Sequence, residues 1–205
     1  MNIFSNLRNK ELSDFLDKTL NNYYDKVITK NLSINLSKDS IELINANYKE
    51  AVSISVDFLD KEINSKIKSR LSGKKDIFGK LFPIKNSTLL DCTAGYGRDS
   101  YVLRSMGFNV TMIENSPVMS LLLNDALKKL KLSNFNMYHG NSYDYLNHSE
   151  KYYDYIYIDF MFNKLKKNSL SSKNNETLKL ISFQENDKNN LIRLAIKKSN
   201  HRVVV

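Results

Sequence analysis

Cysteine is nearly absent from this sequence, because Cys92 is the single one among 205 residues, so no disulfide can form within the chain. The three histidines, His139, His148 and His201, are scattered and form no metal-ligand cluster with it. No apolar run is long enough to cross a membrane, and the N-terminus lacks the apolar segment of a signal peptide. We therefore expect a cytoplasmic protein without a metal centre, in which Cys92 is a small packing residue.

Basic residues outnumber acidic ones by 31 to 22, which gives a formal net charge of +9. Such an excess favours a polyanionic partner, usually a nucleic acid. Lysine, asparagine, isoleucine and tyrosine are abundant together, however, and AT-rich coding produces this pattern without any functional cause. The charge therefore indicates RNA binding but does not establish it. The length and the hydrophobic content of 41% suffice for one medium domain and a small appendage.

The most informative segment joins a buried strand to a helix through a glycine turn. A short apolar run ends in Asp91, Gly95 and Gly97 bracket the turn, and a helix is predicted over 98–106. Glycines let the backbone approach a ligand because no Cβ intervenes, so this arrangement can cradle a nucleotide-like cofactor. Ser100 replaces the third glycine of the dinucleotide fingerprint, which argues against a bound pyrophosphate. The motif resembles that of S-adenosylmethionine (SAM) methyltransferases, and the alternative is a purely structural turn.

A second acid follows the next predicted strand. Residues 109–113 form that strand, and Glu114 ends it at about the distance expected for an acid that binds ribose hydroxyls. A carboxylate in this position can accept both hydroxyl protons of a ribose. The alternative interpretation is an ordinary solvated acid.

A third acid, Asp159, ends a later predicted strand and should face the same crevice. The segment from Asp159 to Phe162 resembles the Asp/Asn-Pro-Pro-aromatic motif of amino-group methyltransferases. There a carboxylate and a backbone carbonyl hold an exocyclic amine, and an aromatic ring stacks on the base. Because SAM carries an activated methyl group, most of the rate gain would come from positioning. The alternative is that Phe160 and Phe162 cover the sheet edge.

Strands and helices alternate from residue 88 onward, which predicts an α/β fold with a doubly wound, Rossmann-like sheet of the class I SAM-methyltransferase type. Ligands of such a sheet bind at the carboxyl ends of its strands. The predicted strands span 88–92, 109–113, 135–138, 153–158 and 202–205. The predicted helices span 98–106 and 117–131, with a further helix within 176–198.

The residues before this sheet predict a small β-rich lobe. A helix is expected over 11–30, followed by alternating strands at 32–36, 41–44 and 52–58. We therefore expect three parts: the helix and lobe in 1–60, a basic linker or helix in 61–86, and the SAM-binding domain in 87–205. The basic part could follow a phosphate backbone or be an ordinary solvated helix.

Several motifs together resemble one family, the ribosomal RNA small subunit methyltransferases J. The run from Asp91 to Asp99 is close to the family's D-A-T-A-G-L-G-R-D, and residues 112–117 match its M-L-E-R-N-P. Further matches lie at 55–58, 121–125, 139–142 and 158–163. The run T-A-G-x-G-R-D is far more specific than a bare G-x-G, and the resemblance covers most of the chain.

The resemblance implies SAM-dependent methylation of a guanine N2 near the 3′ end of 16S ribosomal RNA. SAM is then the cofactor, the small ribosomal subunit is the partner, and neither a metal nor Cys92 takes part. Asp159 would orient the target amine, and Phe162 would stack on the base or shape the pocket. The SAM contacts implied by the resemblance are Arg98, Asp99, Glu114, Asn115, Asn141, Ser142 and Asp159, with Asp91, Gly95 and Gly97 added from the turn.

Three departures from the family pattern leave other functions open. Phe160 and Asn163 replace the two prolines of D-P-M-F-P, which would loosen this loop. The family's glycine-rich basic stretch is reduced to residues 71–75, and the chain stops at Val205, where two more strands are expected. The alternatives are a non-catalytic RNA-binding or ribosome-assembly protein, and an amino-methyltransferase that acts on DNA adenine or on a protein.

Overall fold

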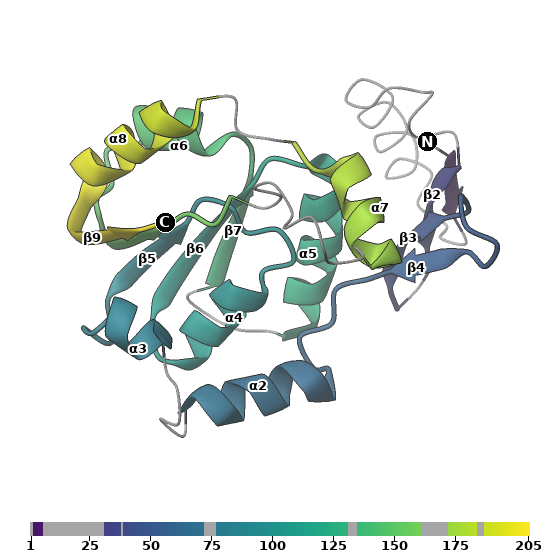
Figure 1. Cartoon of the computed structure of the whole chain (residues 1–205), viewed down its shortest axis with the longest axis horizontal. Coiled ribbons are helices and arrows are strands. Elements are labelled where there is room, and N and C mark those ends of the chain that lie inside the picture. The colour runs from purple at the N-terminus through teal and green to yellow at the C-terminus, as the bar shows by residue number, and fades with distance from the viewer. Residues whose placement is uncertain are drawn as a thin grey trace.

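The computed structural model describes residues 2–5, 31–37, 39–71, 77–130, 135–160, 172–183 and 187–205. The predicted helix over 11–30 lies outside these residues, and so does Phe162. The described residues form a four-stranded sheet near the N-terminus and a five-stranded sheet in the rest of the chain (Figure 1).

The larger sheet is parallel throughout and has the strand order β7-β6-β5-β8-β9. Its strands are β5 (Thr88–Asp91), β6 (Asn109–Glu114), β7 (Phe135–His139), β8 (Tyr153–Tyr157) and β9 (Ser199–Val204). The chain order reverses between β5 and β8, which is the point where doubly wound sheets bind their ligands. The predicted class of fold is therefore confirmed.

Helices cover both faces of this sheet (Figure 1). On one face lie α4 (Arg98–Ser105) and α5 (Pro117–Leu130), and on the other α6 (Ser142–His148) and α8 (Lys188–Lys198). Successive strand residues point to opposite faces, so Leu89 packs in the core that contains α4 and α5, and Leu90 in the core that contains α6 and α8. Both leucines are buried, as expected for a parallel sheet covered on both sides.

The smaller sheet has the order β1-β2-β3-β4. Its strands are β1 (Asn2–Ser5), β2 (Leu32–Leu36), β3 (Ile41–Asn45) and β4 (Val52–Ile54). The predicted hairpin of β2 and β3 is confirmed, and β3 pairs antiparallel with β4. The sequence did not predict β1, which pairs parallel with β2. The expected strand over 52–58 is shorter, because a turn follows in which Asp57 Oδ1 accepts the N–H of Leu59 at 2.8 Å.

A helix from the last third of the chain, α7 (Lys173–Ile181), packs against the smaller sheet (Figure 1). Asn45 Nδ2 donates to Thr177 Oγ1 at 2.7 Å, and both residues are 0% exposed. Leu43 of the lobe and Leu178 of α7 belong to the same hydrophobic core as the α4–α5 side of the larger sheet. The lobe is therefore completed by residues distant in sequence, and the division of the chain into 1–60, 61–86 and 87–205 stays a prediction.

The basic segment between the two sheets contains α2 (Lys61–Leu71) and α3 (Ile77–Leu81). Asp60 begins α2 as its cap, since its carboxylate accepts the N–H of Glu62 at 2.7 Å. Ile63 and Ile67, four residues apart on one helix face, are buried. The helical form of this segment is thus observed, while a role in binding phosphates stays a prediction. No helix in the described part of the chain has both the length and the apolar composition needed to cross a bilayer.

Candidate functional site

The carboxyl ends of β5 and β8 meet beside the glycine turn, as predicted. A cavity of about 200 Å³ opens there. Residues from both strand ends and from the turn line it, among them Asp91, Thr93, Arg98, Asp99, Tyr157 and Asp159. Two of the three predicted acids thus face one cavity, and the third, Glu114, is bonded to the turn that borders it.

The glycine turn depends on backbone conformations that other residues rarely adopt. Gly95 has φ 53° and Gly97 has φ 67°, and the N–H of Gly97 donates to the carbonyl of Ala94 at 2.7 Å. A Cβ on Gly97 would lie 2.7 Å from Leu123 Cδ1 and 3.1 Å from Phe58 Cζ. The fold itself therefore requires glycine at both positions, in addition to any role that the glycines have in letting a ligand approach.

Glu114 is buried, so the interpretation of this residue as a solvated acid is wrong. It is 9% exposed, Oε2 accepts the N–H of Gly95 at 2.7 Å, and Oε1 accepts the N–H of Ser116 at 2.7 Å. Burial raises the pKa of its carboxyl group. Glu114 thus fixes the turn against β6. A carboxylate has about four acceptor sites, so a ribose hydroxyl could be bound in addition.

Asp91 holds the turn from the other strand. It is 2% exposed, Oδ1 accepts the N–H of Thr93 at 2.9 Å, and the hydroxyl of Ser100 donates to Oδ2 at 2.6 Å. Ser100 occupies the position of the third glycine in the dinucleotide fingerprint, and its hydroxyl ties the end of β5 to the first turn of α4. This partnership was missed from the sequence. Burial raises the pKa of Asp91 to about 7.

The raised pKa of Asp91 predicts a loss of stability with rising pH. The folded protein binds this proton more tightly than the unfolded chain, whose carboxyl pKa is near the ordinary value of 3.8. The free energy of unfolding should therefore fall as the pH rises from about 4 to about 7, and by roughly 2–3 kcal/mol between about pH 5 and pH 8. Asp91→Asn should remove this part of the pH dependence, which urea unfolding at several pH values would measure. Equal pH profiles for the two proteins would contradict the assignment.

Asn141 and Ser142 position the loop between β7 and α6. Asn141 Oδ1 caps α6 by accepting the N–H of Asp144 at 3.1 Å, and the hydroxyl of Ser142 donates to the carbonyl of Cys92 at 2.5 Å. Cys92 is buried in the core on that face, consistent with a packing residue. The loop thus lies next to the end of β5. The expected contacts of Asn141, Ser142 and Asn115 with the cofactor stay predictions.

Asp159 lies two residues beyond β8, and its N–H donates to Thr93 Oγ1 at 2.7 Å. Burial, and then the negative charge of Asp99, raise the pKa of its carboxyl group. Phe160 packs against the α6–α8 core, and the ammonium of Lys188 lies 4.8 Å from its ring centre. The expected role of Phe162 lies outside the described residues.

Tyr157 is a further cavity residue that the sequence analysis missed. Its hydroxyl donates to Asp99 Oδ2 at 3.0 Å, and it precedes Asp159 by two positions. Because side chains alternate along a strand, a polar residue two positions before a candidate acid is a signal that could have identified it.

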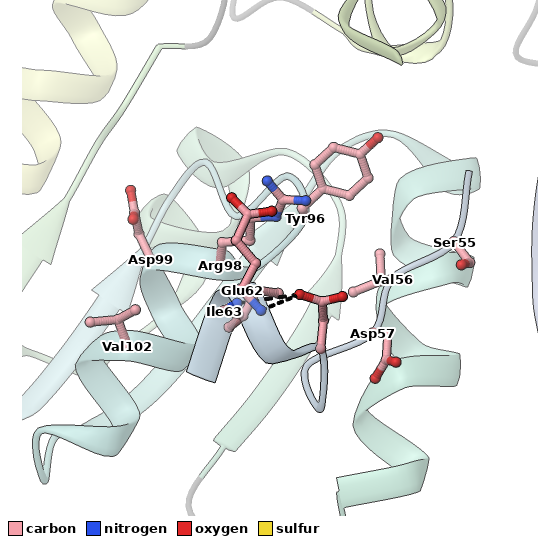
Figure 2. A pocket seen from close by; sticks show the side chains of 10 residues that line it. Ser55, Val56, Asp57, Glu62, Ile63, Tyr96, Arg98, Asp99 and Val102 are labelled. Carbon is pink, nitrogen blue, oxygen red and sulfur yellow. Dashed lines mark hydrogen bonds between the residues drawn. The ribbon is translucent and has the colours of Figure 1, made fainter. Parts of the chain in front are cut away.

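A larger cavity, of about 490 Å³, lies next to the first one. Tyr96, Arg98 and Asp99 line both cavities, and residues between 55 and 63 form the opposite wall of the larger one (Figure 2). The guanidinium of Arg98 lies 5.3 Å from the ring centre of Tyr96. Dashed lines in Figure 2 mark the bonds by which Asp60 caps α2. The segment that leaves the N-terminal lobe therefore borders the candidate site.

Comparisons with known proteins agree with this geometry. A family described as "Putative SAM-dependent methyltransferase" matches residues 20–205. A crystal structure of a SAM-dependent methyltransferase from Neisseria gonorrhoeae has the same fold, with a TM-score of 0.61 and 22% identity, over 84% of this chain and 69% of that one.

Similar sequences carry the name "Ribosomal RNA small subunit methyltransferase J". One from Buchnera aphidicola is 30% identical over 100% of this chain and 86% of its own length, and one from Alteromonas mediterranea is 32% identical over 80% and 67%. One from Coxiella burnetii is 38% identical over 58% of this chain. The match covers 49% of the Coxiella protein, so this chain spans about half the length of that relative. The chain therefore belongs to the SAM-dependent methyltransferase family that includes the ribosomal RNA small subunit methyltransferases J.

Proposed function

We propose that this protein transfers the methyl group of SAM to the N2 amine of a guanine in 16S ribosomal RNA, within the small ribosomal subunit. The observation that carries the proposal is the arrangement of Asp91, Glu114 and Asp159 around one glycine turn, at the switch point of the parallel sheet. Relatives that bear the name of a small-subunit RNA methyltransferase support the choice of substrate.

The residues of the crevice fit SAM. Glu114 lies against the glycine turn, where its carboxylate can accept ribose hydroxyl protons. Asp99 and Asp159 give the cavity a negative charge that favours the positive sulfonium centre. When bound, SAM supplies an activated methyl group, and the protein has to orient the acceptor.

Asp159 is the residue that would orient the acceptor amine. An exocyclic amine has two protons, and a carboxylate that accepts one of them can aim the nitrogen lone pair at the methyl group. The bond from the N–H of Asp159 to Thr93 fixes the backbone of this residue beside the turn. Burial and the charge of Asp99 raise the pKa of this carboxyl group, which makes it a stronger base for the proton that the methylated amine releases.

RNA would be held by basic side chains beside the crevice and by the N-terminal lobe. Lys61, Lys68 and Lys80 of α2 and α3 are exposed, and α2 follows directly from the segment that borders the larger cavity. Lysine ammonium groups bind phosphates without regard to sequence, so this contact would give affinity and base contacts would give specificity. Binding should therefore weaken as salt is raised.

Calorimetry with SAM, for the wild type and for Glu114→Ala, tests the first half of this proposal. We expect micromolar binding by the wild type and a loss of at least about tenfold in affinity for Glu114→Ala, because the carboxylate that holds the ribose is removed. Glu50→Ala, which changes an exposed acid of the lobe, is the control and should bind as the wild type does. Glu114→Gln, with its fold checked by circular dichroism, covers the case in which the alanine variant unfolds.

Transfer of labelled methyl to small subunits that lack the modification tests the second half. Label in guanine N2 of 16S RNA would support the proposal. Label in DNA or protein, with none in the subunit, would identify an amino-methyltransferase with another substrate. Salt-dependent RNA binding by a folded protein that does not bind SAM would identify a non-catalytic RNA-binding protein.

A further inference from the structure

One hydrogen bond joins two residues that line the smaller cavity, one at the end of a strand and one at the start of a helix. The hydroxyl of Tyr157, the last residue of β8, donates to Oδ2 of Asp99 in the first turn of α4, at 3.0 Å. Both residues line the cavity of about 200 Å³ that also contains Arg98 and Asp159. The carboxylate of Asp99 is thus held in one direction by a side chain from the neighbouring strand.

The ring of Tyr157 is itself fixed by packing. It makes edge contacts with Phe78 and Phe82, whose ring centres lie 6.2 Å and 6.1 Å away. Burial and the nearby carboxylates, Asp99 first among them, raise the pKa of Tyr157, so the hydroxyl keeps its proton and acts as a donor. A rigid donor of this kind can set the orientation of the acid it contacts.

The two residues at the start of α4, Arg98 and Asp99, have charges complementary to those of a bound amino acid. Arg98 and Asp99 are adjacent, have opposite charges and line the same cavity. The methionine half of SAM is a zwitterion, in which a carboxylate and an ammonium group are bonded to the same α-carbon. A carboxylate can accept several hydrogen bonds at once, so Asp99 can receive a ligand ammonium while it is bonded to Tyr157.

We propose that Tyr157 is a positioning residue, which orients Asp99 to bind the α-ammonium group of the methionine half of SAM. This inference rests on the proposed function, because it requires SAM in the crevice. It adds a residue outside the predicted site and assigns one ligand group to Asp99.

The test compares two ligands that differ in the methionine half. S-adenosylhomocysteine, the thioether that remains after methyl transfer, carries the amino-acid group, whereas 5′-methylthioadenosine is also a neutral thioether of adenosine and lacks that group. Tyr157→Phe should bind S-adenosylhomocysteine about tenfold more weakly than the wild type does and bind 5′-methylthioadenosine equally well, since only a hydrogen bond to a charged group is affected. Tyr155→Phe is the matched control, because Tyr155 lies two positions earlier on β8 and its hydroxyl accepts the N–H of Ile84 at 3.0 Å, away from Asp99.

A second variant, Asp99→Asn, should show the same selective loss, and the loss in the double variant should be smaller than the product of the two single losses. If Tyr157→Phe does not fold, the inference is judged on Asp99→Asn, and an unchanged preference for S-adenosylhomocysteine over 5′-methylthioadenosine in that variant overturns it. Equal loss of both ligands in Tyr157→Phe would show that Tyr157 has a general structural role and would also overturn it. If the folded wild type binds neither ligand, the proposed function fails and the inference fails with it.

Discussion

Asp159→Asn is expected to lower the rate of methyl transfer at saturating SAM and RNA by about 100-fold or more, a typical loss when a positioned acid–base group is removed. Asparagine has nearly the shape of aspartate, and the bond from the backbone N–H of residue 159 to Thr93 does not depend on the side chain. The amide would present a donor or a neutral acceptor to the target amine, so the nitrogen lone pair would lose its alignment. Single-turnover transfer of labelled methyl to small subunits measures this effect.

A loss of activity in Asp159→Asn must be separated from a loss of cofactor, because Asp159 is also a predicted SAM contact. The affinity for SAM should change far less than the rate. Asp144→Asn, which alters an exposed acid on α6, is the control and should retain wild-type transfer. Full activity of Asp159→Asn would show that another group orients the amine. If the affinity for SAM and the rate of transfer fall together, Asp159 contacts the cofactor and does not orient the amine.

Gly97→Ala is expected to destabilise the fold by roughly 2–4 kcal/mol, the sum of left-handed backbone strain and overpacking. The residue has φ 67°, and its new Cβ would lie 2.7 Å from Leu123 Cδ1 and 3.1 Å from Phe58 Cζ. Leu123 is buried in α5 and Phe58 lies in the turn after the N-terminal lobe, so neither can easily move away. Urea unfolding, monitored by circular dichroism, measures the loss.

Gly107→Ala separates the two contributions to that loss. Gly107 has φ 99°, but the nearest atom to its Cβ would be Asn86 Oδ1 at 3.4 Å, so only backbone strain is added, roughly 1–2 kcal/mol. If Gly97→Ala lowers the free energy of unfolding no more than Gly107→Ala does, the side chains of α5 and of the turn after the lobe move aside without measurable destabilisation. SAM binding should weaken only in Gly97→Ala, since its turn carries the bond from Gly95 to Glu114.

The part of the site that could be predicted from sequence follows from local rules. Asp91, Glu114 and Asp159 each come at the end of an apolar run, and the ends of parallel strands meet at one edge of a sheet. Their positions at the ends of predicted strands were therefore sufficient to predict that the three acids lie at one edge of the sheet. The prediction of one helix within 176–198 was incomplete, because the structure has two, α7 and α8. The missed signal is Asp187, which caps α8 by accepting the N–H of Asn190 at 3.0 Å.

The remaining features depend on partners that no local pattern specifies. Tyr157 and Asp99 are 58 positions apart, so their bond is a result of packing β8 beside α4. Ser100 has a structural role, the hydrogen bond to Asp91, and a comparison with glycine motifs could not identify this role. The parallel pairing of β1 with β2 is likewise a tertiary contact, which strand propensity alone does not specify.

The cover that α7 provides for the N-terminal sheet has a consequence for how the chain is made. Asn45 and its buried partner Thr177 are 132 positions apart, so a ribosome adding about 5–20 residues per second releases the first well before the second, by roughly 7–26 s. During that interval the apolar side of the sheet lacks the helix that later covers it. The strands of the lobe are thus synthesised well before the helix that covers them, and nascent-chain chaperones and proteases would have access to the sheet in the meantime.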